Sequence, residues 1–124
     1  MKIAIVIPAF NEESIIGDIV KRSLKYSSEV LVCDDGSSDN TYEIAKRFGA
    51  TTIQHNTNQG KGATLRTLFQ KALEKNPDII VTLDGDGQFL PEEIPKIIKP
   101  ISEQNVDVVI GYRFDDKNKI PCYR

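Results

Sequence analysis

Residues 3–34, IAIVIPAFNEESIIGDIVKRSLKYSSEVLVCD, decide the fold class that the sequence predicts. Two uninterrupted apolar runs, residues 3–7 and 30–33, are rich in Val and Ile, which is typical of strands that are covered on both faces. Between these runs, apolar residues recur at a helical period, and charged residues occupy the opposite side. The apolar stripe consists of Ile15, Ile16, Ile19, Val20 and Leu24. The pattern predicts a strand, an amphipathic helix and a second buried strand.

The alternation of strands and helices continues along the rest of the chain. Apolar runs at residues 79–83 and 106–110, and a weaker one at 51–54, predict three more strands. A further helix is predicted from about residue 61 to residue 75, with an apolar face toward the sheet. That face consists of Leu65, Leu68, Phe69, Ala72 and Leu73. Such alternation is typical of an α/β fold, and we expect a three-layer sandwich with a mostly parallel central sheet.

Two more helices are predicted from residues that typically begin or end a helix. One lies after the second strand and has an apolar face formed by Tyr42, Ala45 and Phe48. Ser38 or Asp39 is its expected N-cap, and Gly49 is its expected end. The other begins at Pro91, because proline and the acidic residues that follow it suit the first turn of a helix.

Length and composition limit the classes of protein to which the chain can belong. At 124 residues the chain fits one domain, which we assign to residues 1–113, with residues 114–124 as a truncated or disordered tail. The 16 basic and 18 acidic residues leave a net charge of −2, so no basic stripe is available for nucleic acid. Cys33 and Cys122 lack the spacing of a zinc site or a disulfide framework, which favours free thiols in a reducing cytoplasm. No apolar run approaches the ~20 residues of a membrane-spanning helix.

Polar segments follow each predicted strand, and they carry the candidate site. In open α/β sheets, ligands bind outside the carboxyl ends of the strands, so these segments should converge on one edge. The edge would gather five carboxylates: Glu12, Asp34, Asp35, Asp84 and Asp86. A divalent cation would relieve their mutual repulsion, and oxygen ligands favour Mg²⁺ or Mn²⁺.

Residues 84–88, DGDGQ, are the candidate diphosphate and metal site. Asp84 and Asp86 are separated by one residue in a glycine-containing turn, so their oxygens can point at one cation and at a ribose. A metal that bridges two phosphates stabilises the charge of a nucleoside diphosphate leaving group. A DxD triplet alone is weak evidence, because aspartates are common in turns, but its position directly after a buried strand strengthens this interpretation.

Other polar residues leave alternatives open. Asp34 and Asp35 could form an Asx-turn and a helix cap, although we favour hydrogen bonds to a nucleobase or ribose. A second set, at a predicted helix start, could equally cradle a phosphate or form a plain turn. This set is Asn58, Gly60, Lys61 and Gly62. His55 is expected to be a surface or strand-end residue rather than a catalyst. The glycine spacings match neither a dinucleotide-binding fingerprint nor a P-loop.

At these residues the sequence resembles the glycosyltransferase family 2 enzymes of the GT-A, or nucleotide-diphospho-sugar transferase, fold. The branch that it resembles most is that of the dolichyl-phosphate mannose and glucose synthases. The resemblance rests on five blocks in the same order and covers nearly the whole chain. The blocks are IVIPAFNEE (5–13), VCDDGSSDNT (32–41), NQGKGA (58–63), DGDGQFLPEEIP (84–95) and VVIGYR (108–113).

The resemblance implies roles for single residues. The donor-nucleotide-binding residues would be Pro8, Phe10, Glu12, Cys33, Asp35, Asp84 and Arg113. Within this set, Asp35 would contact the base, and Asp84 would hold the ribose or diphosphate. Asp86 and Gln88 would be the metal ligands. Asp84 and Asp86 are then the candidate catalytic residues.

The activity that we expect is an inverting transfer of a hexose from a UDP- or GDP-sugar, with Mg²⁺ or Mn²⁺. The candidate acceptor is a polyprenyl phosphate such as dolichyl phosphate, met at the cytoplasmic face of a membrane. A lipid phosphate is already ionised near neutral pH, so it needs no catalytic base. Family members continue past this point with acceptor-binding elements. The chain alone could therefore be an inactive, truncated form that only binds the donor nucleotide.

Two other classes of protein use similar acidic residues. A phosphatase-like hydrolase would use Asp84 as the nucleophile and Asp86 as the acid, but that class usually places the pair after its first strand, and here it follows the fourth. A receiver-like signalling domain would use Asp34 and Asp35 as an acidic pocket and Asp84 as the phosphoacceptor. Labelling of Asp84 by acetyl phosphate would favour the receiver.

Overall fold

The computed structural model describes residues 2–83, 91–96 and 108–110, and these residues include a five-stranded sheet. The strands are β1 (Ile3–Ala9), β2 (Glu29–Asp34), β3 (Thr51–Gln54), β4 (Ile79–Thr82) and β5 (Val108–Ile110). Their order across the sheet is β3-β2-β1-β4-β5, and every neighbouring pair is parallel. β1 is the central strand and pairs with both β2 and β4.

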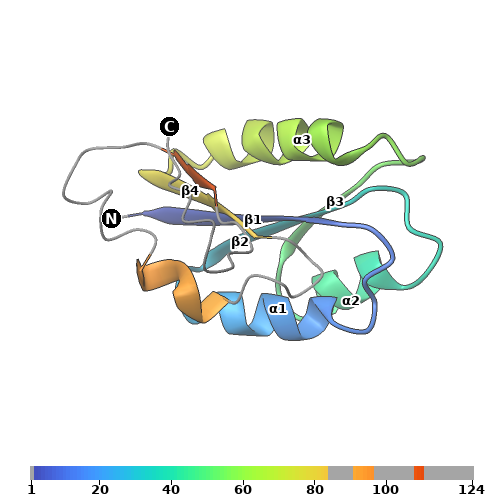
Figure 1. Cartoon of the computed structure of the whole chain (residues 1–124), viewed down its shortest axis with the longest axis horizontal. Helices are drawn as coiled ribbons and strands as arrows, with labels where there is room; N and C mark the ends of the chain where they lie inside the picture. The colour runs from blue at the N-terminus through green and yellow to red at the C-terminus, as the bar shows by residue number, and fades with distance from the viewer. Residues whose placement is uncertain (1, 84–90, 97–107, 111–124) are drawn as a thin grey trace, which may run out of the picture.

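Helices cover both faces of the sheet, as Figure 1 shows. α1 (Ile16–Ser23) and α2 (Thr41–Arg47) lie on one face, and α3 (Lys61–Leu73) lies on the other. One apolar cluster packs the sheet against α1 and α2, and a second packs alternate strand residues against α3. Because successive strand residues point to opposite faces, only nearly continuous apolar runs can fill both clusters. The predicted α/β sandwich with a parallel sheet is confirmed.

The lengths of the elements also agree with the sequence. The observed strands match the predicted ones to within two residues at each end, except that residues 106 and 107 lie outside the described ranges. The helix before β2 has 8 residues, and the one before β4 has 13. In the described part of the chain, no helix has both the length and the apolar character that crossing a membrane requires.

The buried face of α3 is narrower than predicted. Leu68 and Ala72 are completely buried against the sheet, and Leu65 and Phe69 pack partly buried at the edge of the same cluster. Leu73, however, is 61% exposed. At 3.6 residues per turn, Leu73 lies about 140° around the helix from Leu68, so it cannot face the same sheet. The prediction of Leu73 as a core residue is therefore wrong.

The ends of α2 differ slightly from the prediction. The N-cap position falls one residue after Asp39, but Asp39 Oδ1 still accepts the backbone N–H of Thr41 at 3.0 Å. Gly49 follows the last turn with φ 111°, as expected for a helix end. Ala45 is completely buried, whereas Phe48 is 42% exposed. Phe48 is the C-cap residue, so it lies beyond the helical positions that the predicted stripe assumed.

The order of the strands reverses direction at β1. The chain adds β2 and then β3 on one side of β1, and α3 carries it back across the sheet to β4 on the other side. A topological switch point of this kind lies between β1 and β4. Open α/β sheets bind their ligands in the crevice outside the carboxyl ends of the strands at such a point.

Candidate functional site

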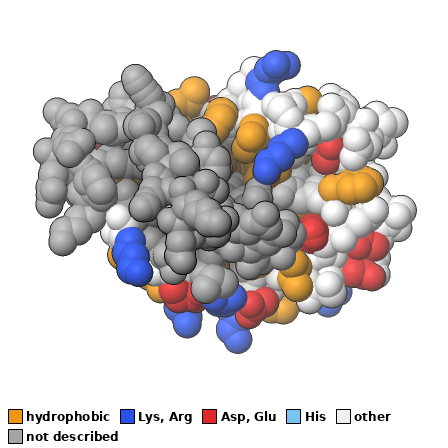
Figure 2. Space-filling view, in the orientation of Figure 1, with side chains coloured by type: hydrophobic (Ala, Val, Ile, Leu, Met, Phe, Trp, Pro, Cys, Tyr) orange, Lys and Arg blue, Asp and Glu red, His pale blue; other side chains and the backbone are white. Residues whose placement is uncertain are grey.

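The loops after β1, β2 and β3 meet at the carboxyl edge of the sheet, on the right in Figure 1. In the same orientation, Figure 2 shows Asp and Glu side chains at this end of the molecule, with others along its lower edge. Leu83, which follows β4, donates its N–H to Val6 O at 3.0 Å, so β4 ends beside β1. The polar segments that the sequence singled out after β1, β2 and β3 therefore lie at the switch-point edge.

The loop after β1 is joined to the loop after β2 by hydrogen bonds. Asn11 has φ 53°, a left-handed conformation that asparagine tolerates better than most residues. Its N–H donates to Ser37 Oγ at 2.8 Å, and its Oδ1 accepts the N–H of Ser38 at 2.9 Å. The N–H of Glu12 donates to Thr41 Oγ1 at 2.9 Å. The backbone of Glu12 is thus fixed at the edge where the sequence placed it.

Two predicted pocket residues at the end of β1 differ in exposure. Pro8 lies half-buried within the strand, whereas Phe10, directly after the strand, is 46% exposed. A half-exposed aromatic ring offers an apolar face on which a planar base can stack. The structure places both residues at the candidate site, and their contact with a donor stays a prediction.

The two adjacent aspartates at the end of β2 have separate roles. Asp34 is completely buried and accepts the N–H of Ser37 at 3.1 Å and the side-chain N–H of Gln54 at 3.1 Å. The hydroxyl of Ser37 donates to the same carboxylate. Asp34 thus stabilises the turn after β2 from its side chain, as the alternative interpretation expected, but the hydrogen bond reaches three residues on and not the two of an Asx-turn. Because Asp34 is buried and hydrogen-bonded, it does not fit the exposed acidic pocket of a receiver-like domain.

Asp35 is held by three hydrogen bonds from the segment after β3. Its Oδ1 accepts the Nδ1–H of His55 at 2.8 Å and the backbone N–H of Gln59 at 2.9 Å. Its Oδ2 accepts the backbone N–H of Gly60 at 2.9 Å. Burial by itself raises the pKa of this carboxyl, but the hydrogen bonds from His55, Gln59 and Gly60 outweigh burial, so the pKa lies below its ordinary value. Asp35 is therefore an ionised and oriented acceptor.

His55 directly follows β3, as expected of a strand-end residue, but it is neither a surface residue nor without partners. Its side chain is 10% exposed, and its Nε2 lies 2.9 Å from Thr67 Oγ1 of α3. Because an ionised Asp35 can only accept, Nδ1 of His55 carries a proton, whichever way the contact with Thr67 is oriented. The partners lie 20 and 12 residues away along the chain, so no local pattern indicated them.

Cys33 lies beside this pair, with its Sγ 3.7 Å from His55 Nε2. A cysteine, a histidine and an aspartate in consecutive contact resemble the activated thiol of a cysteine nucleophile. Burial, and after it the charges of Asp35 and Asp34, instead raise the pKa of this thiol to about 12. Cys33 is also completely buried, so its side chain has no exposed surface to offer a donor, and its predicted contact with the nucleotide stays a prediction.

We expect Cys33 to resist thiol reagents in the folded chain. In a Cys122→Ser variant, its reaction with Ellman's reagent at mildly alkaline pH should be at least ~100-fold slower in native buffer than in guanidinium chloride, because both access and the thiolate fraction are low. The absorbance of the released thiolate, followed over time, measures both rates. Equal rates would show that the thiol is accessible and would contradict its assignment as an inert, buried residue.

Close approach of two loops depends on Gly36. This residue has φ 76°, and a Cβ added to it would lie 2.6 Å from Asn58 N and 2.7 Å from Thr57 C, both of them backbone atoms. The following Gly60 is the N-cap residue of α3 with φ 98°. Its N–H and that of Gln59 already donate to Asp35, which favours the plain-turn interpretation of this segment over a phosphate cradle.

Four predicted site residues, Asp84, Asp86, Gln88 and Arg113, lie outside the described residues. Within residues 2–83, 91–96 and 108–110, no group of three or more His, Cys, Asp or Glu side chains could hold a metal ion. The predicted convergence of carboxylates on one cation therefore stays a prediction.

The chain that follows residues 84–90 is anchored to α1. Arg22 of α1 makes ion pairs with Glu92, in the 3-10 helix η1 (Pro91–Glu93), and with Asp18. The hydrogen bonds with Glu92 and then Asp18 raise the pKa of Arg22, and Arg22 lowers the pKa of Glu92. Ile94 is completely buried in the core cluster of α1 and α2. These contacts fix the position at which the chain returns from the predicted metal-binding segment.

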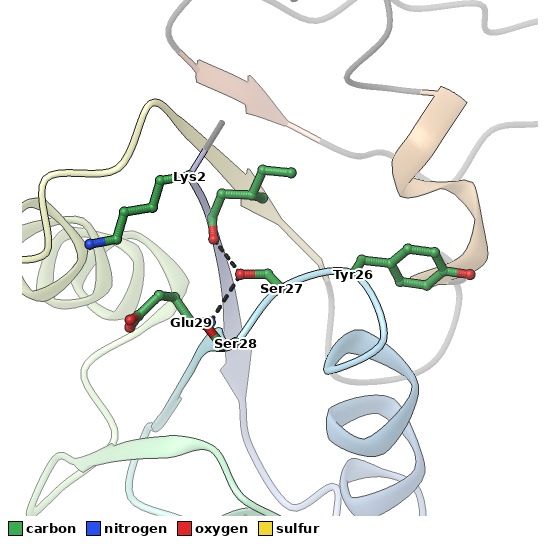
Figure 3. Close-up of a pocket in the computed structure, with 6 residues that line it drawn as sticks. Lys2, Tyr26, Ser27, Ser28 and Glu29 are labelled. Carbon is green, nitrogen blue, oxygen red and sulfur yellow. Dashed lines mark hydrogen bonds between the residues drawn. The ribbon is translucent and has the colours of Figure 1, made fainter.

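A pocket of about 270 Å³ lies at the opposite, amino edge of the sheet. Its lining residues are Lys2, Ile3, Tyr26, Ser27, Ser28 and Glu29 (Figure 3). Within it, Ser27 Oγ donates to the carbonyl of Ile3 and accepts the N–H of Glu29 (Figure 3). This edge is remote from the carboxyl ends of the strands, so the pocket is not the switch-point site.

Comparison with protein families gives a match over residues 4–122, to the family described as glycosyl transferase family 2. An uncharacterized protein of Methanocaldococcus jannaschii is 42% identical, over 96% of this chain and 49% of the relative. The UDP-N-acetylglucosamine-dolichyl-phosphate N-acetylglucosaminyltransferase of Methanococcus voltae is 35% identical, over 90% of this chain and 51% of the relative. The undecaprenyl-phosphate 4-deoxy-4-formamido-L-arabinose transferase of Photorhabdus laumondii is 35% identical, over 87% of this chain and 36% of the relative. The chain thus spans about half or less of the length of these relatives.

Solved structures with the same fold include glucosyl-3-phosphoglycerate synthase of Mycobacterium tuberculosis. It matches with a TM-score of 0.66 and 26% identity, over 81% of this chain and 40% of that chain. The same enzyme in complex with Mn²⁺, UDP and glucosyl-3-phosphoglycerate matches with a TM-score of 0.66 and 25% identity, over 81% of this chain and 39% of that one. Because the family match covers nearly the whole sequence, the chain belongs to glycosyl transferase family 2, with the GT-A fold and the polyprenyl-phosphate sugar transferase relatives that its motifs predicted.

Proposed function

We propose that this chain is the donor-binding part of a metal-dependent glycosyltransferase that transfers a hexose from a UDP- or GDP-sugar to a polyprenyl phosphate. The observation that carries the proposal is the state of Asp35. Its carboxylate is ionised, oriented by three hydrogen bonds and located at the switch-point edge of a GT-A sheet. The N–H of Asp35 donates to Ala9 O at 2.9 Å, so the half-exposed Phe10 follows directly in the neighbouring loop. An acceptor and an aromatic ring in adjacent loops suit the N–H edge and the flat face of a nucleobase.

The diphosphate and its metal belong to the segment after β4 in this proposal. Leu83, the residue before the DGDGQ segment, is fixed beside β1 at the switch point by its hydrogen bond to Val6. Asp86 and Gln88 would hold Mg²⁺ or Mn²⁺, because carboxylate and amide oxygens suit these hard cations. When bound, the metal neutralises the charge that develops on the departing nucleoside diphosphate. Structures of the M. tuberculosis synthase contain Mn²⁺ or Mg²⁺ together with UDP, which supports this assignment.

The acceptor is proposed from the relatives and from its chemistry. Two relatives are named for transfer to dolichyl phosphate or undecaprenyl phosphate. A phosphate oxygen that is ionised near neutral pH can attack the anomeric carbon without losing a proton to the protein. The bond between that carbon and the diphosphate breaks as the new bond forms on the opposite face, so the configuration inverts. The reaction would take place at the cytoplasmic face of a membrane.

Titration calorimetry with UDP and with GDP, each with and without Mn²⁺, tests the proposal on the chain as it stands. We expect at least one nucleotide to bind and Mn²⁺ to strengthen that binding. Asp86→Ala should weaken the Mn²⁺-dependent binding by about tenfold or more, since loss of even an indirect metal contact costs that much. If neither UDP nor GDP bound in the presence of Mn²⁺, the proposal would be contradicted.

The matched control is Glu74→Ala. Glu74 is an exposed carboxylate just beyond the carboxyl end of α3, which lies at the amino edge of the sheet, and its substitution changes the net charge in the same way. Nucleotide affinity of this variant should equal that of the unmodified chain. If Glu74→Ala lowered the affinity as much as Asp86→Ala, the loss would not be specific to the predicted metal site, and the assignment of Asp86 as a metal ligand would fail.

A further inference from the structure

The carboxylate of Asp35 has little acceptor capacity left. A carboxylate offers about four lone-pair positions, two on each oxygen. His55 and Gln59 take both positions of Oδ1, and Gly60 takes one position of Oδ2. Among the contacts of the described residues, one position on Oδ2 therefore remains for a ligand.

His55 is fixed in a way that keeps this arrangement stable. The imidazole is 10% exposed and spans from Asp35 at the end of β2 to Thr67 of α3. If the ring is neutral, Nε2 accepts the hydroxyl proton of Thr67; if it is protonated, Nε2 donates to the same oxygen, and Thr67 donates to Ala63 O, 3.1 Å away. The neighbouring groups that can titrate are Asp35, Asp34 and Cys33. In both states of the ring, Nδ1 still donates to Asp35.

We infer that His55 is a positioning residue of the donor site, which orients Asp35 so that it accepts one N–H from the nucleobase. This inference rests on the proposed function. An Asp35 carboxylate with one free acceptor position favours a base with a single imide N–H, such as uracil, over guanine. Guanine presents two adjacent N–H donors, which pair best with both oxygens of a carboxylate, and here Oδ1 is already occupied.

The inference separates the role of the imidazole from that of any side chain of similar size. In His55→Asn, the amide nitrogen takes the place of Nδ1 and can still donate to Asp35. In His55→Gln, the amide lies farther out, where it can reach Thr67 but no longer occupies Oδ1 of Asp35. The two variants carry the same functional group, so they form a matched pair that differs in which partner is kept.

The test is calorimetry with UDP, 3-methyl-UDP and GDP in the presence of Mn²⁺, on the full 124-residue chain. The methyl group of 3-methyl-UDP removes the N–H that Asp35 would accept. We expect the unmodified chain to bind UDP about tenfold more tightly than 3-methyl-UDP, as for one hydrogen bond to a charged group. GDP should also bind more weakly than UDP. The ratio for 3-methyl-UDP should persist in His55→Asn and approach one in His55→Gln.

The readout is the ratio of the affinities for UDP and 3-methyl-UDP, because a purely structural role of His55 would weaken the binding of all three nucleotides alike. A ratio that is unchanged in His55→Gln, as judged on protein shown to be folded by its thermal transition, would overturn the inference and leave the proposed function intact. Equal binding of UDP, 3-methyl-UDP and GDP by the unmodified chain would overturn it without any variant. If no nucleotide binds, the proposed function fails, and this inference fails with it.

Discussion

Asp35→Asn is expected to lower the free energy of unfolding at neutral pH by about 3 kcal/mol and to remove measurable UDP binding. The amide has the size of the carboxylate but presents one N–H₂ group, so either the Nδ1–H of His55 or the N–H of Gly60 faces a donor instead of an acceptor. With the Asp35 side chain only 6% exposed, water cannot replace the lost bond. Denaturant unfolding and calorimetry with UDP measure the two effects.

The same substitution should change how stability depends on pH. The pKa of Asp35 is lowered by folding, so its ionised form contributes its full stabilisation above the ordinary value of 3.8, and the contribution is lost as the pH falls through the lower folded value. The difference in unfolding free energy between the two proteins should shrink as the pH falls below about 4. Glu74→Gln, at a side chain that is 64% exposed, is the control, and its difference should stay near zero. If the difference for Asp35→Asn did not change below about pH 4, these hydrogen bonds would not lower the pKa of the Asp35 carboxyl.

Gly36→Ala is expected to destabilise the chain by about 3 kcal/mol. Part of the cost is the left-handed backbone at φ 76°, and part is the clash of the new Cβ with backbone atoms of Thr57 and Asn58. Backbone atoms cannot move aside as the end of a flexible side chain can. The displaced segment leads into Gln59 and Gly60, so binding of UDP should weaken as well. Thermal and denaturant unfolding report the first effect, and calorimetry reports the second.

Two other glycines separate the causes of that loss. Gly60→Ala places a Cβ in open space, but φ 98° and ψ 162° form a conformation that essentially only glycine adopts, so it should cost only the backbone strain, about 1–3 kcal/mol. Gly62→Ala lies inside α3, also with open space around the new Cβ, and should stabilise the helix by roughly 0.5–1 kcal/mol. If Gly36→Ala cost no more than Gly60→Ala, the close approach of the two loops would have no energetic importance.

The fold was predictable because its signals are local. β1, β2, β4 and β5 each contain an unbroken apolar run, and the stripe of α1 is visible within ten residues, so neither signal depends on knowing the tertiary contacts. The error at Leu73 has the same origin, because apolar character was taken as burial where the helical rotation had already carried the residue away from the sheet. A local pattern shows which residues are apolar, but the width of the helix face that is buried against the sheet depends on tertiary packing.

The position of the candidate site was predictable from the sequence, but the hydrogen-bond partners of its residues were not. The parallel order of strands and helices places the loops after β1, β2 and β3 at one edge, and the sequence alone was sufficient to expect Glu12 and Asp35 there. It could not separate Asp34 from Asp35. Successive strand residues point to opposite faces, which leads one carboxylate to Ser37 and Gln54 and the other to the segment after β3.

The sequence by itself determined the parallel α/β sandwich, the family and the edge of the sheet at which the candidate site lies, because apolar periodicity and motif order are properties of the chain read in one direction. The tertiary structure alone decided that His55 is a partner of Asp35, that Cys33 is buried beside His55 and that Gly36 permits two loops to touch. Each of these depends on atoms brought within a few ångströms of each other from segments about 20 residues apart, and the geometry of such contacts leaves no periodic trace in the sequence.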